Sequence, residues 1–280
     1  MSQTNWNAPP APPPPQLRPR DWLRVARRGL ALGGLIAVCL AIMMALRLIE
    51  RPLWGKRRPL TPFLTQFVSL SAFWILGMGY QRRGARMQGR GAVVANHVSW
   101  MDIFALNAGK RVYFVSKAEV AGWPGIGLLA RATGTVFIKR DPREAKHQQE
   151  IFEERLLAGH KLLFFPEGTS TDGMVVLPFK TTLFQAFFAP ELRQRIAVQP
   201  VSLIYHAPEG ADPRFYGWWG DMDFGTHLLR VLAAPQQGRV EVVYHDPLAL
   251  RDFASRKDLA AQCEAAIRAA MPKGRQGGGA

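Results

Sequence analysis

The chain has 280 residues, of which 48% are hydrophobic and 20% charged, a composition typical of a globular protein with one sizeable catalytic domain plus appendages. Its net charge of +15 favours an anionic partner, which could be nucleic acid, anionic lipid or an acidic carrier protein. The two cysteines, Cys39 and Cys263, provide neither a disulfide framework nor a metal-ligand spacing, so we expect no bound metal.

The N-terminus combines prolines with arginines. Prolines stand at positions 9, 10 and 12–15, and arginines at 18, 20, 24, 27 and 28 follow them. Low complexity of this kind favours disorder or a polyproline conformation. We therefore expect residues 1–28 to form a disordered N-terminus.

Residues 29–46 form a run without any charged residue (GLALGGLIAVCLAIMMAL). A helix of this length would be about 27 Å long at about 1.5 Å per residue, at the short end of the range for a membrane span. A membrane helix is the favoured interpretation, and a buried core helix is the alternative. A cleaved signal peptide fits less well, because the run starts late and no convincing cleavage site follows.

A second apolar stretch, residues 59–80, also lacks charges but carries Gln66, several hydroxyl groups and two prolines. It could enter the bilayer, lie at its interface or pack on the catalytic domain. Basic residues flank both stretches and fill the loop between them, so the positive-inside rule does not decide the topology. We expect membrane-associated, partly immersed helical segments over residues 29–80.

From about residue 90, short β-rich runs alternate with helical stretches such as 143–158 and 180–189. This alternation predicts an α/β fold with a mostly parallel sheet flanked by helices. The expected catalytic domain covers residues 81–270, and residues 271–280 are expected to be a flexible tail. The predicted strands are 91–95, 112–115, 135–138, 161–165, 196–204 and 240–244.

The first polar cluster follows the predicted strand 91–95 and contains His97 and Asp102. Imidazole can accept a proton from a hydroxyl near neutral pH, and a carboxylate can fix its tautomer and stabilise the imidazolium. A separation of five residues places two side chains on different faces of a regular helix, so the pair requires His97 in a turn and Asp102 in the first turn of a helix. The alternative is a capping motif with Asn96 or Ser99 as the cap.

Two further clusters follow other predicted strands. Lys139 and Arg140 could bind an anionic head group, and a solvated strand end is the alternative. Gly168 allows close approach of the backbone, and its neighbouring amides could donate to a developing oxyanion. Glu167 could bind the polar group of an acceptor or order the site, and an ordinary turn is the alternative.

Loops at the carboxyl ends of parallel strands share one edge of a sheet, where ligands usually bind. We therefore expect the three clusters to meet in space. Neither a Gly-x-Ser-x-Gly elbow nor a plausible catalytic cysteine accompanies them. The residues favour direct transfer from a thioester to an alcohol by a single base, without a covalent nucleophile or a cofactor.

Four motifs in order resemble those of the glycerolipid acyltransferase family, which includes the 1-acylglycerol-3-phosphate acyltransferases. His97 and Asp102 match its His-x4-Asp motif. The second block is matched by Gly134, Phe137 and Arg140, the third by residues 165–169 (FPEGT), and the fourth by Val198, Pro200 and Val201. The resemblance covers roughly residues 75–245.

The resemblance implies that His97, with Asp102, activates the hydroxyl of a lysolipid acceptor. It also implies an acyl carrier protein or acyl-CoA as the donor. With the contact to membrane lipids, it leads us to expect a bacterial inner (cytoplasmic) membrane location with the catalytic domain facing the cytoplasm. Because the second and third blocks bind the acceptor in this family, the expected substrate-binding residues are Lys139, Arg140, Glu167, Gly168 and Thr169.

Three segments favour one branch of the family. Lys180 is followed by Thr181, whereas members that acylate lysophosphatidic acid usually carry a basic residue or glycine there. Residues 115–120 (VSKAEV) and 215–221 (FYGWWGD) resemble the branch that includes bacterial lyso-ornithine lipid acyltransferases. We therefore expect lyso-ornithine lipid as the acceptor, with 1-acyl-glycerol-3-phosphate as an additional or alternative one.

Two functions from other classes are the alternatives. The charge could serve a nucleic-acid-binding module, but the basic residues do not concentrate on a recognition helix or stacking platform. The apolar N-terminal segments also argue against that class, so we expect no nucleic-acid partner. The intact motifs argue against a non-catalytic membrane protein.

Overall fold

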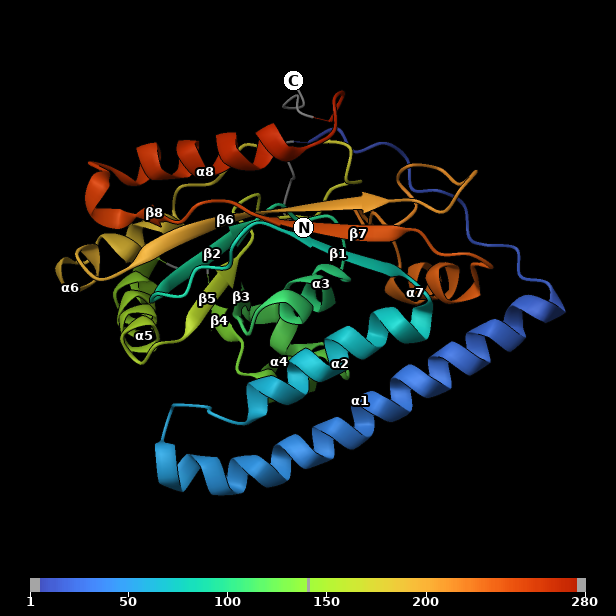
Figure 1. The fold of residues 1–280 in the computed structure, drawn as a ribbon, viewed down its shortest axis with the longest axis horizontal. Coiled ribbons are helices and arrows are strands. Elements are labelled where there is room, and N and C mark those ends of the chain that lie inside the picture. The colour runs from blue at the N-terminus through green and yellow to red at the C-terminus, as the bar shows by residue number, and fades with distance from the viewer. Residues whose placement is uncertain (1–5, 140–141, 276–280) are drawn as a thin grey trace.

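The computed structural model describes residues 6–139 and 142–275. Within them the sheet has the strand order β1-β7-β6-β2-β5-β3-β4, and β8 pairs with β6 (Figure 1). Strands β6, β2, β5, β3 and β4 are mutually parallel, whereas β7 and β8 run antiparallel to β6. The mostly parallel α/β sheet expected from the sequence is therefore confirmed. The strands are β1 Gly79–Arg83, β2 Gly91–Ala95, β3 Tyr113–Lys117, β4 Val136–Ile138, β5 Lys161–Phe164, β6 Ala197–His206, β7 Arg239–Tyr244 and β8 Leu248–Ala249.

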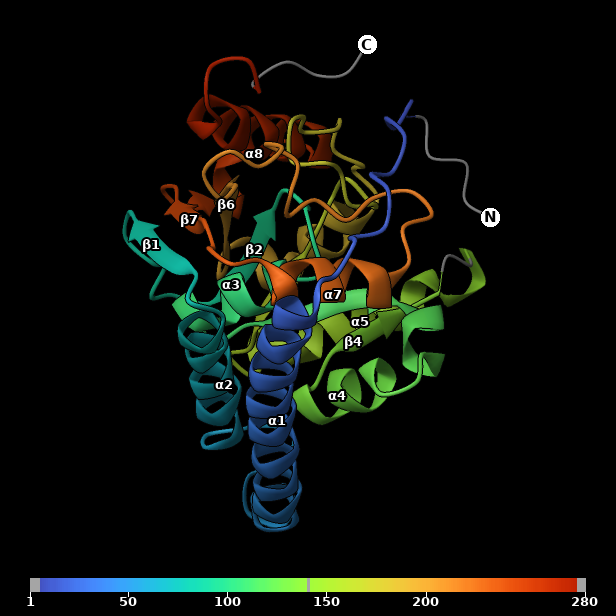
Figure 2. The same cartoon turned by 90° about the vertical axis from the view of Figure 1, so that its right-hand side faces the viewer.

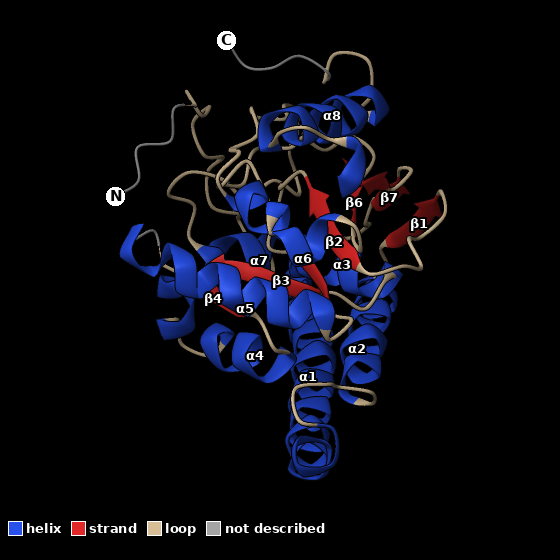
Figure 3. Ribbon diagram, turned by 90° about the vertical axis from the view of Figure 1, so that its left-hand side faces the viewer, coloured by secondary structure: helices blue, strands red, loops and turns tan. Residues whose placement is uncertain are grey.

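Helices cover both faces of the sheet (Figure 3). Every residue of β2 is buried, and a strand buried on both sides needs cover on both sides. Ala92 and Val94 pack in a core cluster with residues of α5 and α8, whereas Val93 and Ala95 pack in a second cluster with residues of α2, α3 and α7. The helices are α1 Pro19–Trp54, α2 Thr61–Leu76, α3 Asp102–Gly109, α4 Ile126–Thr133, α5 Ala145–Leu157, α6 Pro190–Arg193, α7 Phe224–Ala233 and α8 Arg256–Ala270.

Near both ends, described residues depart from the disorder that the sequence predicts. Helix α1 begins at Pro19, so residues 19–28 are helical and not part of a disordered N-terminus. Proline suits the first position of a helix, where no N–H partner is needed. Before it, the Pro9 carbonyl oxygen accepts a hydrogen bond of 2.8 Å from Trp219 Nε1. At the other end, Met271 is buried and not part of a flexible tail, and residues 276–280 lie outside the described part.

Two further elements differ from the prediction. β1 was not expected, because its sequence GYQRR lacks alternating apolar residues; it pairs with β7 at the edge of the sheet. The predicted helix over residues 180–189 is a 3-10 helix, Leu183–Phe188. Its buried Phe184 and Phe187 are three residues apart, which matches the three-residue turn of that helix.

Helices α1 and α2 lie side by side and project from the body of the protein (Figure 2). Among the described helices, only the 36-residue α1 is long and apolar enough to cross a membrane, and 17% of its most apolar window is buried. Large apolar side chains of the pair, including Leu30, Leu48 and Trp74, are exposed. An exposed apolar surface of this kind is typical of membrane association, which we assign to these N-terminal helices.

Candidate active site

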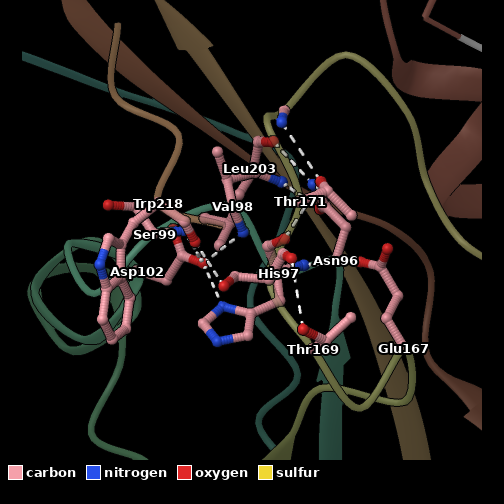
Figure 4. A network of polar contacts seen from close by, with 12 residues as sticks. Asn96, His97, Val98, Ser99, Asp102, Glu167, Thr169, Thr171, Leu203 and Trp218 are labelled. Carbon is pink, nitrogen blue, oxygen red and sulfur yellow. Dashed lines mark hydrogen bonds and ion pairs between the residues drawn. The ribbon is translucent and has the colours of Figure 1, made fainter. Parts of the chain in front are cut away.

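His97 and Asp102 form a close pair after β2. The strand ends at Ala95, and α3 begins at Asp102, so the histidine lies in the intervening turn and the carboxylate in the first helical turn. His97 Nδ1 lies 2.7 Å from Asp102 Oδ2 (Figure 4). This is the local geometry that the five-residue spacing requires.

The Asp102 carboxylate is completely buried, and its charge is satisfied by several donors. Besides the imidazole, Oδ2 accepts hydrogen bonds from the N–H groups of Val98 (2.8 Å) and Ser99 (3.1 Å). The Tyr205 hydroxyl donates to Oδ1 at 2.8 Å. Buried polar groups are stable only when they are hydrogen-bonded, so this network holds the carboxylate group in one position. Asp102 thus both orders the turn and holds the imidazole.

The plane and the tautomer of the His97 ring are fixed from two sides. The ring stacks on Phe165, with centroids 4.0 Å apart and an interplanar angle of 9°. Asp102 Oδ2 is an acceptor, since it also receives the Val98 and Ser99 N–H groups, so the imidazole donates from Nδ1 and Nε2 has a lone pair. No described residue hydrogen-bonds Nε2, and the His97 side chain is 21% exposed. A neutral imidazole in this state can accept a proton at Nε2.

Glu167 connects the loop after β5 to the loop after β2. Its Oε1 accepts from the His97 N–H and its Oε2 from the Leu177 N–H, both at 2.7 Å. The carboxyl group is 1% exposed. Burial raises the pKa of Glu167 to about 8, although the two N–H bonds act in the opposite direction. Because both oxygens are occupied within the protein, the geometry favours the ordering role over contact with an acceptor.

The neighbouring residues Gly168 and Thr169 have different roles in the turn. Gly168 adopts the left-handed conformation with φ of 74°, and its N–H donates to the Phe165 carbonyl oxygen at 3.1 Å. That N–H closes the turn, and the neighbouring amides of Gly168 remain the ones predicted to donate to a developing oxyanion. Thr169 is partly exposed, and among the described residues its hydroxyl contacts only the Ser170 carbonyl oxygen, at 3.4 Å.

Lys139, the described member of the second predicted cluster, does not contact the first and third clusters. Lys139 follows β4, which is separated from β5 by β3. Its side chain is 67% exposed and lies 3.7 Å from Glu144 Oε1. Lys139 shares the carboxyl edge of the sheet with His97, but it makes no described contact with the His97–Asp102 pair. Arg140 lies outside the described residues.

Sequence reasoning missed several residues that support the pair. Tyr205 lies in β6, just beyond the predicted end of that strand. It is two residues from Leu203 and four from Val201, so the three side chains point to the same face of the sheet, and they share one core cluster. Asn96 Nδ2 donates to the Leu203 carbonyl oxygen at 2.9 Å, and Asn96 Oδ1 accepts from the Leu203 N–H at 2.7 Å. No pattern in the sequence indicated either hydrogen bond. The described residues contain no group of three or more metal-ligating side chains.

Comparisons with known proteins agree with this geometry. The family model described as Acyltransferase matches residues 80–204. The lyso-ornithine lipid O-acyltransferase of Rhodobacter capsulatus is 58% identical over 273 residues, covering 97% of this chain and 98% of the relative. A protein of the same name from Brucella abortus is 34% identical over 255 residues, covering 86% and 92%.

A solved structure shows the same fold. The crystal structure of the 1-acyl-sn-glycerophosphate acyltransferase of Thermotoga maritima matches with a TM-score of 0.59 at 21% identity, covering 89% of this chain and 93% of that one. Both the matched family model and the relatives that span nearly the whole chain lead to one conclusion. The chain belongs to the acyltransferase family, and it is an O-acyltransferase of lipid biosynthesis.

Proposed function

We propose that His97 is the general base of the acyl transfer and that Asp102 orients it. The observation that carries this assignment is the 2.7 Å contact between His97 Nδ1 and Asp102 Oδ2, which leaves Nε2 to accept a proton. Nε2 takes the proton of the acceptor hydroxyl as the oxygen attacks the carbonyl carbon of the donor thioester. The tetrahedral intermediate then collapses with cleavage of the C–S bond, and the imidazolium returns the proton to the departing thiolate.

The acceptor is proposed to be lyso-ornithine lipid, and the product ornithine lipid. The Rhodobacter capsulatus relative with that name aligns with 97% of this chain, which supports the proposal. We assign contact with the acceptor head group to Thr169, Lys139 and Arg140, and we assign the support of the loop to Glu167 and Gly168. The alternative is a dedicated 1-acylglycerol-3-phosphate acyltransferase, and the acceptor assay below distinguishes the two activities.

The location and the donor are proposed from surface chemistry. We place α1 and α2 in a bacterial inner membrane with the catalytic domain, residues 81–270, facing the cytoplasm. The exposed apolar side chains of the two helices support their contact with lipid. The donor is acyl carrier protein or acyl-CoA, and the net charge of +15 would attract an acidic carrier.

His97→Ala tests the mechanism. General-base catalysis contributes about a hundredfold to ten-thousandfold, so we expect at least about a hundredfold loss of acyl transfer with unchanged membrane retention. His147→Ala is the matched control, because that side chain is 68% exposed on α5, and we expect its activity to equal wild type. Full activity of His97→Ala would rule out the base.

The acceptor is tested in the same membranes with a radiolabelled acyl donor. We expect labelled ornithine lipid from lyso-ornithine lipid. Product from 1-acyl-glycerol-3-phosphate alone would replace the acceptor assignment and leave the base assignment intact. Acyl carrier protein and acyl-CoA donors, supplied separately, identify the donor by the same readout.

A further inference from the structure

The N-terminal helix α1 caps a helix of the catalytic domain. Arg28 is 6% exposed, and its guanidinium donates to the carbonyl oxygens of Leu232 at 2.8 Å and Ala234 at 2.6 Å. Helix α7 ends at Ala233, so these carbonyls belong to its last turn and to its C-cap residue, whose oxygens lack partners within the helix. A cation at this end also complements the helix dipole. Arg28 therefore supplies two of the hydrogen bonds and a positive charge at the α7 C-terminus.

Helix α7 in turn holds the loop that carries the catalytic pair. His227 of α7 is completely buried, and its Nδ1 accepts a hydrogen bond of 2.9 Å from Trp100 Nε1. Trp100 lies between His97 and Asp102 in the sequence and packs edge-on against Phe224 at the start of α7, with ring centroids 5.5 Å apart. A displacement of α7 would therefore move the Trp100 segment of the turn.

A second arginine makes an equivalent contact at the other end of the helical pair. Arg58, between α1 and α2, donates to the Ala132 carbonyl oxygen at 2.6 Å in the last turn of α4. Two helix C-termini of the catalytic domain are thus capped from the N-terminal helical pair. The pair is bound to the domain at fixed points by buried or partly buried arginines, which a simple lipid anchor would not need.

We propose that Arg28 is a positioning residue for acyl transfer, acting through α7, His227 and Trp100 on the loop of His97 and Asp102. This inference rests on the catalytic pair proposed above. It makes α1 part of the catalytic scaffold as well as the membrane-associated element. Loosening the Arg28 contact should misplace the imidazole without releasing the protein from the membrane, because the apolar surface of α1 is unchanged.

The first test compares Arg28→Gln with Arg27→Gln in the full-length protein. Arg27 is the neighbouring arginine on the same helix and is exposed, so it controls for the loss of charge. We expect Arg28→Gln to lower kcat about tenfold with little change in KM for the donor, since small misplacement of reacting groups costs this much or more. We expect Arg27→Gln to retain wild-type kcat, Arg28→Lys to recover part of the loss, and all three to stay in the membrane fraction.

The second test is a double-variant cycle with Trp100→Phe, which removes the indole N–H donor to His227. If Arg28 acts through this contact, the double variant should lose about as much kcat as the more impaired single variant. Losses that multiply, or equal kcat for Arg28→Gln and Arg27→Gln, would overturn the proposal. His97→Ala in the same series tests the general base separately from the positioning role of Arg28. If His97→Ala retained activity, the assignment of His97 as the base would be refuted, whatever kcat Arg28→Gln has.

Discussion

Removing one hydroxyl group from Tyr205 gives a direct test of the buried network around Asp102. Tyr205 donates to Asp102 Oδ1 at 2.8 Å and is 4% exposed. Burial, together with the negative charge of Asp102, raises the pKa of the Tyr205 phenol well above its usual value, so it remains a donor at every pH used for assays. Tyr205→Phe removes this donor while it keeps the aromatic ring.

The size of the effect follows from the partners that remain. Asp102 Oδ2 keeps its contacts with His97, Val98 and Ser99, whereas Tyr205 is the sole donor to Oδ1 among the described residues. A hydrogen bond to a charged group contributes about 1.5–3 kcal/mol, so we expect a loss of about 2 kcal/mol in the free energy of unfolding. A carboxylate with one free oxygen can also rotate, and a rise of about 1.4 kcal/mol in the barrier would lower kcat about tenfold.

The assay compares kcat and thermal unfolding of Tyr205→Phe with those of Tyr216→Phe. The Tyr216 ring lies 5.6 Å from that of Tyr205, but its hydroxyl bonds to Gln237 and to the Gly238 N–H and not to Asp102. Both variants should unfold at lower temperature, and only Tyr205→Phe should lose kcat. Equal kcat for the two variants would refute the claim that the phenol supports the catalytic pair.

Two further substitutions test the hydrogen bonds that Glu167 and Asn96 make near the site. Because burial raises the pKa of Glu167 from 4.5 to about 8, the folded protein holds this proton more tightly than the unfolded chain, so the free energy of unfolding should decline as the pH rises through that interval. Glu167→Gln should remove this decline from pH-dependent melting curves. It should also lower activity, because the NH2 of the glutamine side chain would face the N–H of His97 or Leu177. The same pH slope in Glu167→Gln and wild type would contradict the assignment. Asn96→Ala leaves the Leu203 N–H and carbonyl without their side-chain partner. We expect denaturant unfolding to show a loss of about 3 kcal/mol in the free energy of unfolding. A loss below about 0.5 kcal/mol would argue that Asn96 does not link β2 to β6.

Much of the site could be predicted because it depends on local sequence and on one topological rule. The spacing of His97 and Asp102 requires a turn followed by a helix start, and the structure has both. β2 and β5 are parallel neighbours, so the loops that follow them meet and Glu167 reaches the His97 N–H. The same rule places Lys139 on this edge but not in contact with the pair, because the order of strands within a sheet is set by long-range pairing, and β4 lies beyond β3.

The amino-acid sequence by itself determined the alternation of strands and helices, the proposed catalytic pair, the family resemblance and the apolar character of the N-terminal segments. Only the tertiary structure decided which distant residues support the pair. Tyr205 reaches Asp102 across 103 positions and Arg28 reaches Leu232 across 204. Periodicity specifies which face of an element is buried but not which element covers it, so hydrogen bonds between distant elements become visible only when the chain is folded.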